Sequence, residues 1–96
     1  MPYRIDDFNG CINQSFNLEL SDSSPYPLEL ISVDRHPGSA TVGDYEVFSV
    51  VFRANDDAVL EQQIYRINHE TLGDLDLFIV PIGADEKGMR YEAVFS

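Results

Sequence analysis

The two histidines are the first residues that could carry catalytic or metal-binding chemistry, because imidazole titrates near neutral pH. His69 is followed by Glu70, a pair that would begin the His-Glu-x-x-His helix of a zinc hydrolase. The second histidine of that motif would fall at Gly73, and the local pattern favours a strand and a turn, so the motif is excluded. His36 precedes Pro37 in a glycine-containing loop, and we expect it to be exposed rather than a base or a ligand.

In a strand, His69 would share one face with Tyr65 and Ile67, because side chains alternate across a sheet. We therefore expect a hydrogen-bonded structural histidine at a strand end, on the rim of the core. A small enzyme or ligand binder would need a pocket that gathers His69, Tyr65 or Tyr91, and an acid. Residues scattered along the chain would form such a pocket without a local motif; the absence of any catalytic motif favours a chain that is not an enzyme.

Two acidic pairs, Asp56-Asp57 and Asp85-Glu86, fall in turns. A calcium loop places oxygen ligands at alternating positions and closes with a bidentate glutamate. Neither pair has that spacing, so we expect solvated turns and no metal site.

Cys11 is the only cysteine, which excludes an intrachain disulfide and a cysteine-rich zinc site. It has no basic or histidine neighbour that would activate it, so an inert, partly buried thiol is expected. Asn13-Gln14-Ser15 formally matches a glycosylation acceptor, which would matter only in a secreted protein. No phosphate loop or nucleophile elbow is present, so we predict no catalytic, cofactor-binding or metal-binding residues and no cofactor.

Short runs of alternating apolar and polar residues indicate the elements that must position these side chains. The expected strands are 15–20, 27–35, 46–53, 64–69, 75–82 and 89–96; the expected turns and loops are 21–27, 36–44, 54–57, 72–74 and 83–88, with a glycine for positive φ at each end of the last. Residues 59–63 are either a short helix or the lead-in to a strand. A helical turn or two over 5–12 would be capped by Asp6, with Ile5, Phe8 and Ile12 on one side.

Two positions in these strands predict irregular pairing. Apolar residues change face between Leu30 and Ile31, which indicates a bulge. Pro81 cannot donate to a ladder, so its strand must be an edge or bulge there. Five to seven closely spaced strands without a long helix predict an all-β antiparallel sandwich or small barrel, as one domain over residues 1–96.

The excess of acidic residues disfavours negatively charged partners. The chain has 17 acidic and 6 basic residues and a net charge of −11, so we expect neither nucleic acid nor an anionic membrane surface as a partner. The acids are scattered, as is typical of a solvated surface, although an inhibitor that mimics an acidic ligand in a basic groove is the alternative. The polar start of the chain and the absence of an apolar run near 20 residues predict a soluble, cytoplasmic protein.

The strand and turn sequences resemble a family of small bacterial β-domains of unknown function. The residues that carry the resemblance are 16–20, 48–52, 64–69, 72–73, 77–83 and 91–95. Members of that family often lie beside genes for phage tail-fibre-like or tail-collar proteins. The resemblance implies an accessory role in a phage-derived or tail-like assembly and supplies no catalytic residues.

Two strands carry apolar residues on both faces, whereas an isolated antiparallel sheet normally keeps one face wet. Val47 and Val51 occupy the second face of one strand, and Phe78, Val80 and Ile82 that of the other. We therefore predict a structural or protein-interaction module that forms a homo-oligomer or docks on another protein. An edge strand ending at Ile82 or Phe95 could also pair with a partner strand.

Overall fold

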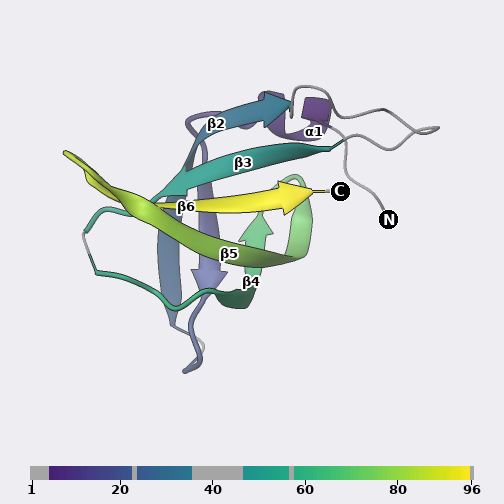
Figure 1. Cartoon of the computed structure of the whole chain (residues 1–96). Helices are drawn as coiled ribbons and strands as arrows, with labels where there is room; N and C mark the ends of the chain where they lie inside the picture. The colour runs from purple at the N-terminus through teal and green to yellow at the C-terminus, as the bar shows by residue number, and fades with distance from the viewer. Residues whose placement is uncertain (1–4, 23, 36–46, 57, 96) are drawn as a thin grey trace.

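The computed structural model describes residues 5–22, 24–35, 47–56 and 58–95 as one short helix and six strands (Figure 1). The elements are α1 (Ile5–Asn9), β1 (Ser15–Glu19), β2 (Pro25–Arg35), β3 (Phe48–Arg53), β4 (Gln63–His69), β5 (Gly73–Asp85) and β6 (Gly88–Phe95). The loop at 36–44 with His36, the expected strand start at Glu46, and Asp57 and Ser96 lie outside the described residues.

The described strands form a closed antiparallel barrel in the order β1-β2-β3-β6-β5-β4. This confirms the all-β prediction and, of the two architectures left open, selects the barrel. Four of the connections between successive strands join neighbours in the barrel, whereas residues 54–62 connect β3 to β4, which are not neighbours. The seam between β1 and β4 is short, with only Asn17↔Asn68 and Leu18↔Ile67 in register.

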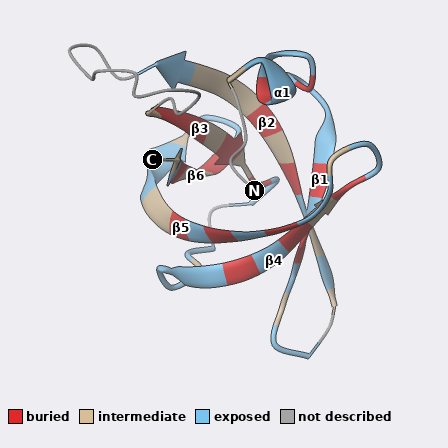
Figure 2. Ribbon diagram, turned by 90° about the vertical axis from the view of Figure 1, so that its right-hand side faces the viewer, coloured by how far each residue is buried: buried red, intermediate tan, exposed pale blue. Residues whose placement is uncertain are grey.

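Buried residues alternate with exposed ones along β1, most of β4 and the first half of β5, as the colours of β4 and β5 in Figure 2 show. The largest fully buried side chains are Tyr91, Phe8, Phe16, Phe48, Phe52, Leu18, Leu28, Leu30, Ile67, Ile79 and Val50. The expected inward set of β3 (Phe48, Val50 and Phe52) is confirmed, since each of the three has 0 % exposure.

Helix α1 is shorter than the 5–12 segment expected, and two of its predicted features are wrong. Asp6 lies within the first turn rather than at a cap, and Ile12 is 36 % exposed beyond the helix end. Phe8 alone is buried, against Phe48 and Phe95 at centroid distances of 5.9 and 5.0 Å. Gly10 does not continue a helix well, and one buried ring is enough to hold a single turn against the barrel.

Strands β2 and β5 depart from the expected bounds because their irregularities are absorbed as bulges. The register shifts between Leu30 and Ser32 and between Pro81 and Gly83, which confirms both predicted bulges. Strand β5 continues through Gly83 (φ 105°) to Asp85, so the expected six-residue loop is instead a two-residue turn at 86–87. The extra residue at the bulge lets the ladder resume beyond the proline.

Three further boundaries differ by a few residues. Strand β2 begins at Pro25, within the expected turn, because Pro25 and Pro27 pair with β1. The turn before β5 occupies 70–72, and Gly73 (φ 79°) already begins the strand. Residues 58–62 form no helix, so the lead-in interpretation is the correct one, with β4 starting at Gln63.

Candidate functional site

His69 is a structural histidine whose two ring nitrogens are both engaged. It is 5 % exposed at the end of β4, and its ring stacks on that of Phe16 with centroids 4.4 Å apart. The backbone N–H groups of Thr71 and Leu72 donate to Nδ1 at 3.1 and 3.2 Å, so Nδ1 carries no proton. Nε2 therefore carries the proton and donates a hydrogen bond to Oε1 of Gln14 at 2.7 Å. The prediction of a hydrogen-bonded histidine at a strand end is confirmed.

An open groove lies beside the seam between β1 and β4. Its lining residues are Gln14, Ser15, Asn17, Asn68, His69 and Glu70. The groove brings the imidazole of His69 and the carboxylate of Glu70 to one place, but neither Tyr65 nor Tyr91 lines it. The pocket that would join an imidazole, a phenol and an acid is therefore not formed there.

Three tyrosine hydroxyls instead fasten the segment 54–62 to the barrel. Tyr91 donates to the carbonyl oxygen of Ala58 (3.1 Å) and accepts from the amide of Leu60 (3.0 Å). Tyr65 donates to the carbonyl oxygen of Glu61 (2.7 Å), and Tyr26 donates to the carboxylate of Asp56 (2.6 Å). These bonds give the irregular connection fixed partners, which a segment without ladder bonds requires.

The phenols of Tyr26 and Tyr91 are neutral donors rather than bases. Burial raises the pKa of Tyr91, and burial together with the hydrogen bond to Asp56 raises the pKa of Tyr26. Both hydroxyls therefore keep their protons throughout the physiological pH range. Their role in this structure is to hold the chain in place.

Tyr91→Phe is expected to lower the free energy of unfolding by about 1–3 kcal/mol, because the Leu60 amide and Ala58 carbonyl lose their common partner. Tyr65→Phe removes a single bond, to Glu61, and should cost about 1 kcal/mol. Urea unfolding followed by circular dichroism measures both. Equal losses in the two variants would contradict the two-bond role of Tyr91.

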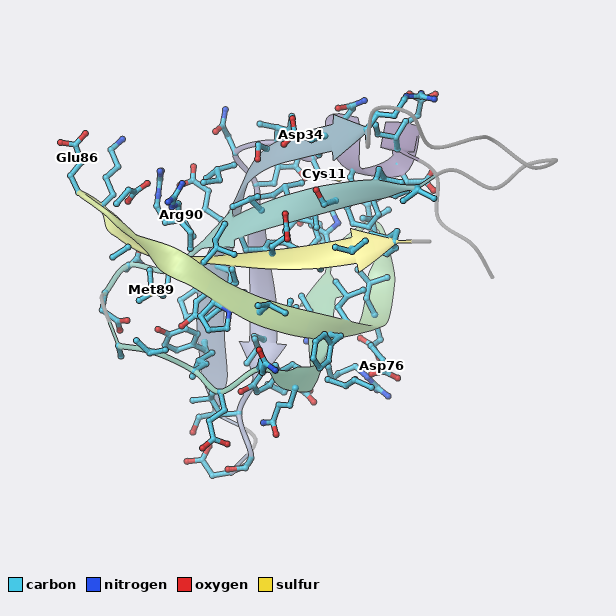
Figure 3. All side chains as sticks on the ribbon, in the orientation of Figure 1. Cys11, Asp34, Asp76, Glu86, Met89 and Arg90 are labelled. Atoms are coloured by element: carbon cyan, nitrogen blue, oxygen red, sulfur yellow. The ribbon has the colours of Figure 1, made fainter. Side chains whose placement is uncertain are left out.

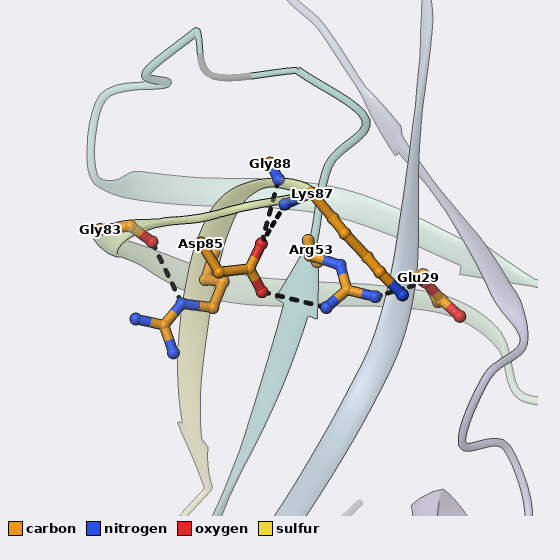
Figure 4. Close-up of polar contacts among 7 residues, drawn as sticks. Glu29, Arg53, Gly83, Asp85, Lys87 and Gly88 are labelled. Carbon is orange, nitrogen blue, oxygen red and sulfur yellow. Dashed lines mark hydrogen bonds and ion pairs between the residues drawn. The ribbon is translucent and has the colours of Figure 1, made fainter.

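Asp85 is the centre of a charged cluster at the base of the β5–β6 turn (Figure 4). Its Oδ1 accepts from the amides of Lys87 (2.8 Å) and Gly88 (3.0 Å), and its Oδ2 accepts from Arg53 (3.0 Å). Arg53 also contacts Glu29 at 3.2 Å. The prediction that the Asp85-Glu86 pair is simply solvated is therefore wrong for Asp85, whose carboxylate organises the turn.

The stability of the fold should depend on the ionisation of Asp85. The Lys87 amide first, and then Arg53 and the Gly88 amide, lower the pKa of this carboxyl below its ordinary value. A lowered folded-state pKa stabilises the fold above the unfolded-state pKa of about 4, and that contribution is lost as pH falls through the folded-state pKa.

Asp85→Asn should therefore lower the melting temperature most at pH 7, with the difference from wild type shrinking as pH falls from 5 to 2. Thermal melts across this range measure the difference, and Glu86→Gln, at the exposed tip of the same turn, is the matched control. A difference in melting temperature between the two proteins that stays constant from pH 7 to pH 2 would show that Asp85 does not contribute to the loss of stability in acid.

The remaining candidate residues have structural partners. Asp56 accepts from Tyr26 and from the Ala58 amide, so it too is more than a solvated acid. Cys11 is buried and its thiol donates weakly to the Asp7 carbonyl; burial, followed by the nearby Asp7 charge, raises its pKa, which opposes formation of the reactive thiolate. Asn13 adopts a positive φ of 72° in the turn before β1.

Within the described ranges, no group of three or more histidine, cysteine and acidic side chains could hold a metal ion. The same residues include no helix long and apolar enough to cross a membrane.

Several large apolar side chains on β4, β5 and β6 are exposed and do not pack in the barrel core. Ile64 (67 % exposed) and Phe78 (51 %) lie directly opposite each other on β4 and β5 and point outward. Val94 on β6 is 53 % exposed, and Ile82 on β5 is 39 % exposed. We name Ile64, Phe78, Val80, Ile82 and Val94 the apolar face; β5 and β6, which carry most of it, lie side by side in Figure 1.

Charged residues border this apolar face. Next to Ile64 and Phe78, Arg66 binds Asp76 across the same two strands, with Nε 2.7 Å from Oδ1. Asp76 is labelled at the lower right of Figure 3. This bond and the charge of Arg66 lower the pKa of Asp76, so the pair is fully ionised at neutral pH.

The sequence identified only part of this surface. Phe78, Val80 and Ile82 were expected on a second face, whereas Val47 and Val51 are partly buried. The sequence alone did not identify Ile64, Glu92 or Val94. Ile64 precedes buried Tyr65, and Glu92 and Val94 flank buried Ala93, so alternation could have indicated that all three face outward. The pairing of a partner strand with an edge at Ile82 or Phe95 stays a prediction, because β4 pairs with β5 only up to Ile79 and β5 pairs with β6 only from Val80 onward.

Comparison with protein families matches residues 3–95 to one family, described as Domain of unknown function (DUF6916). No curated protein and no solved structure matches the chain.

Proposed function

We propose that this chain, which belongs to the DUF6916 family of domains of unknown function, is a non-enzymatic protein-interaction module that docks through its apolar face. The observation that carries the proposal is the group of outward-facing apolar residues on β4, β5 and β6. Four of its five members are more than a third exposed.

The position of these residues favours docking over incidental exposure. Single apolar residues are common on protein surfaces, but a contiguous group on adjacent strands is typical of an interaction site. An aromatic ring at the centre of such a group, as Phe78 provides, is also a frequent anchor of protein interfaces. A rigid closed barrel presents the group without rearrangement, which lowers the entropic cost of binding.

The polar residues favour a module without chemistry. Both nitrogens of His69 are engaged, the phenols of Tyr26 and Tyr91 are neutral, and Asp85 organises a turn. The runner-up function, mimicry of an acidic ligand, would need the carboxylates gathered on one side. The described acids instead lie on the helix, on four of the six strands and in several turns, which argues against it.

The partner that we propose is another protein rather than a second copy. Two chains of net charge −11 repel each other, and this repulsion opposes self-association at low ionic strength. The resemblance to domains encoded near phage tail genes suggests a tail-like or phage-derived assembly in the cytoplasm as the setting. We include that setting in the proposal.

Site-specific photo-crosslinking in cells that naturally express the chain tests the proposal. A benzophenone amino acid at position 78 should give one dominant crosslinked protein partner. The matched control is the same group at position 17 on β1, opposite β6 in the strand order, which should give none. Crosslinking of equal yield at both positions, or at neither, would contradict docking through the apolar face.

Light scattering separates the two kinds of partner. The purified protein is expected to be a monomer at about 100 μM in 150 mM salt, well above the concentrations at which specific complexes form. If the wild type were a dimer and the Phe78→Ser variant a monomer, the apolar face would instead be a site of self-association.

A further inference from the structure

One carboxylate lies inside the apolar face. Glu92 on β6 faces outward between buried Tyr91 and Ala93, and it is paired in register with Val51 of β3 and Val80 of β5. Val94 follows it on the same side of the strand. Glu92 is therefore flanked by valines on three sides and is itself only partly exposed.

Glu92 differs from the other charged residues on this side of the barrel. Arg53 is paired with Glu29 and Asp85, and Arg66 with Asp76. Arg90, two residues before Glu92, donates instead to the carbonyl oxygen of Gly83 at 3.3 Å. Within the part of the chain that the structure describes, the carboxylate of Glu92 has no hydrogen bond or ion pair with another residue.

A partner that covers the apolar face must shield this carboxylate from solvent. Burying an ionised carboxylate without a counter-charge is strongly unfavourable, whereas a buried arginine–carboxylate pair keeps the charge satisfied. We propose that the apolar face binds a protein surface whose apolar residues surround an arginine or lysine, and that this cation pairs with Glu92.

Charge favours this occupant over a second copy of the chain. A two-fold axis through the apolar face would bring two Glu92 carboxylates together, and like charges facing each other across an interface oppose binding. A basic partner would also be attracted by the net charge of −11, which increases the rate of association. The inference rests on the proposed function and specifies the chemistry of its partner.

Two short peptides test the inference by NMR titration of the 15N-labelled protein. The probes are acetyl-Leu-Arg-Leu-amide and the same peptide with citrulline, which keeps the shape of arginine without its charge. We expect the arginine peptide to shift the amides of Val51, Val80, Glu92 and Val94. The citrulline peptide should bind roughly fivefold more weakly, since exposed ion pairs contribute modestly.

Two variants show whether Glu92 is responsible. Glu92→Gln should reduce the affinity for the arginine peptide by the same factor and leave that for the citrulline peptide unchanged. Glu86→Gln removes the same charge at the tip of the β5–β6 turn, labelled in Figure 3, and should change neither. Spectra of the free variants establish that each remains folded.

The outcomes separate this inference from the proposed function. Equal binding of the two peptides at the apolar face would overturn the role of Glu92 and leave docking through that face intact. Shifts confined to other surfaces, such as the acidic turn at Asp85 and Glu86, would overturn both. Arginine-dependent binding that Glu92→Gln does not weaken would assign the cation to another carboxylate and reject the inference.

Discussion

Gly88→Ala is expected to lower the free energy of unfolding by about 4 kcal/mol or more, which is a large fraction of the stability of a typical small domain. Gly88 has a φ of 155°, and an added Cβ would overlap the carbonyl oxygen of Ala54 and lie 3.0 Å from the carbonyl oxygen of Asp56. Neither oxygen belongs to a side chain that could rotate away.

The surrounding hydrogen bonds explain why the backbone there cannot yield. The Met89 amide donates to the Asp56 carbonyl at 2.7 Å, and the Ala54 amide donates to the Met89 carbonyl at 2.9 Å. These bonds hold the chain leaving β3 directly against the first residues of β6. A methyl group at Gly88 must break them or displace the strand.

Gly83→Ala is the matched control, because Gly83 also has a positive φ of 105° but open space around its Cβ position. Its cost should be only the backbone strain of about 1–2 kcal/mol. Urea unfolding of the two variants gives the comparison. Similar losses would mean that the contact with Ala54 is not what requires glycine at position 88.

Phe8→Ala should lower the free energy of unfolding by about 3–5 kcal/mol, the usual cost of a phenylalanine-sized cavity in a core. Phe8 has 0 % exposure and packs against Phe48 and Phe95, whose own rings stack 4.8 Å apart. The effect is large for a residue on a five-residue helix, because the ring belongs to the barrel core and not to the helix alone.

Ile12→Ala is the control from the same segment. Ile12 is 36 % exposed, so its truncation should cost less than about 1 kcal/mol. The sequence placed both residues on one buried side, so the two measurements also test where α1 ends. A loss at Ile12 comparable to that at Phe8 would contradict the observed burial.

The candidate surface was only partly predictable from sequence. Alternation assigned Phe78 and Val80 to a second face, but a second face can be covered by another sheet or exposed to solvent. Ile64 could not be joined to Phe78 without the β4–β5 register. Nothing in the sequence distinguishes Glu92 from the other acids; only the strand register shows that it lies between Val51 and Val80.

The Asp85 cluster shows the same limit. Acids in turns are common, so the pair with Glu86 gave no sign that one carboxylate would accept two amides and an arginine from β3. Arg53 is 32 positions away in the chain. Contacts over such separations follow from strand order, which local patterns do not contain.

The sequence by itself determined that the chain forms short antiparallel strands, which side chains of the strand at 46–53 face inward, and where two bulges occur. These properties depend on side-chain alternation and backbone geometry over a few residues. Only the tertiary structure decided that the strands close into a barrel and that three tyrosines fasten the β3–β4 connection. It alone placed Glu92 within an apolar face, because residues distant in sequence become neighbours only when the strands take their order and register.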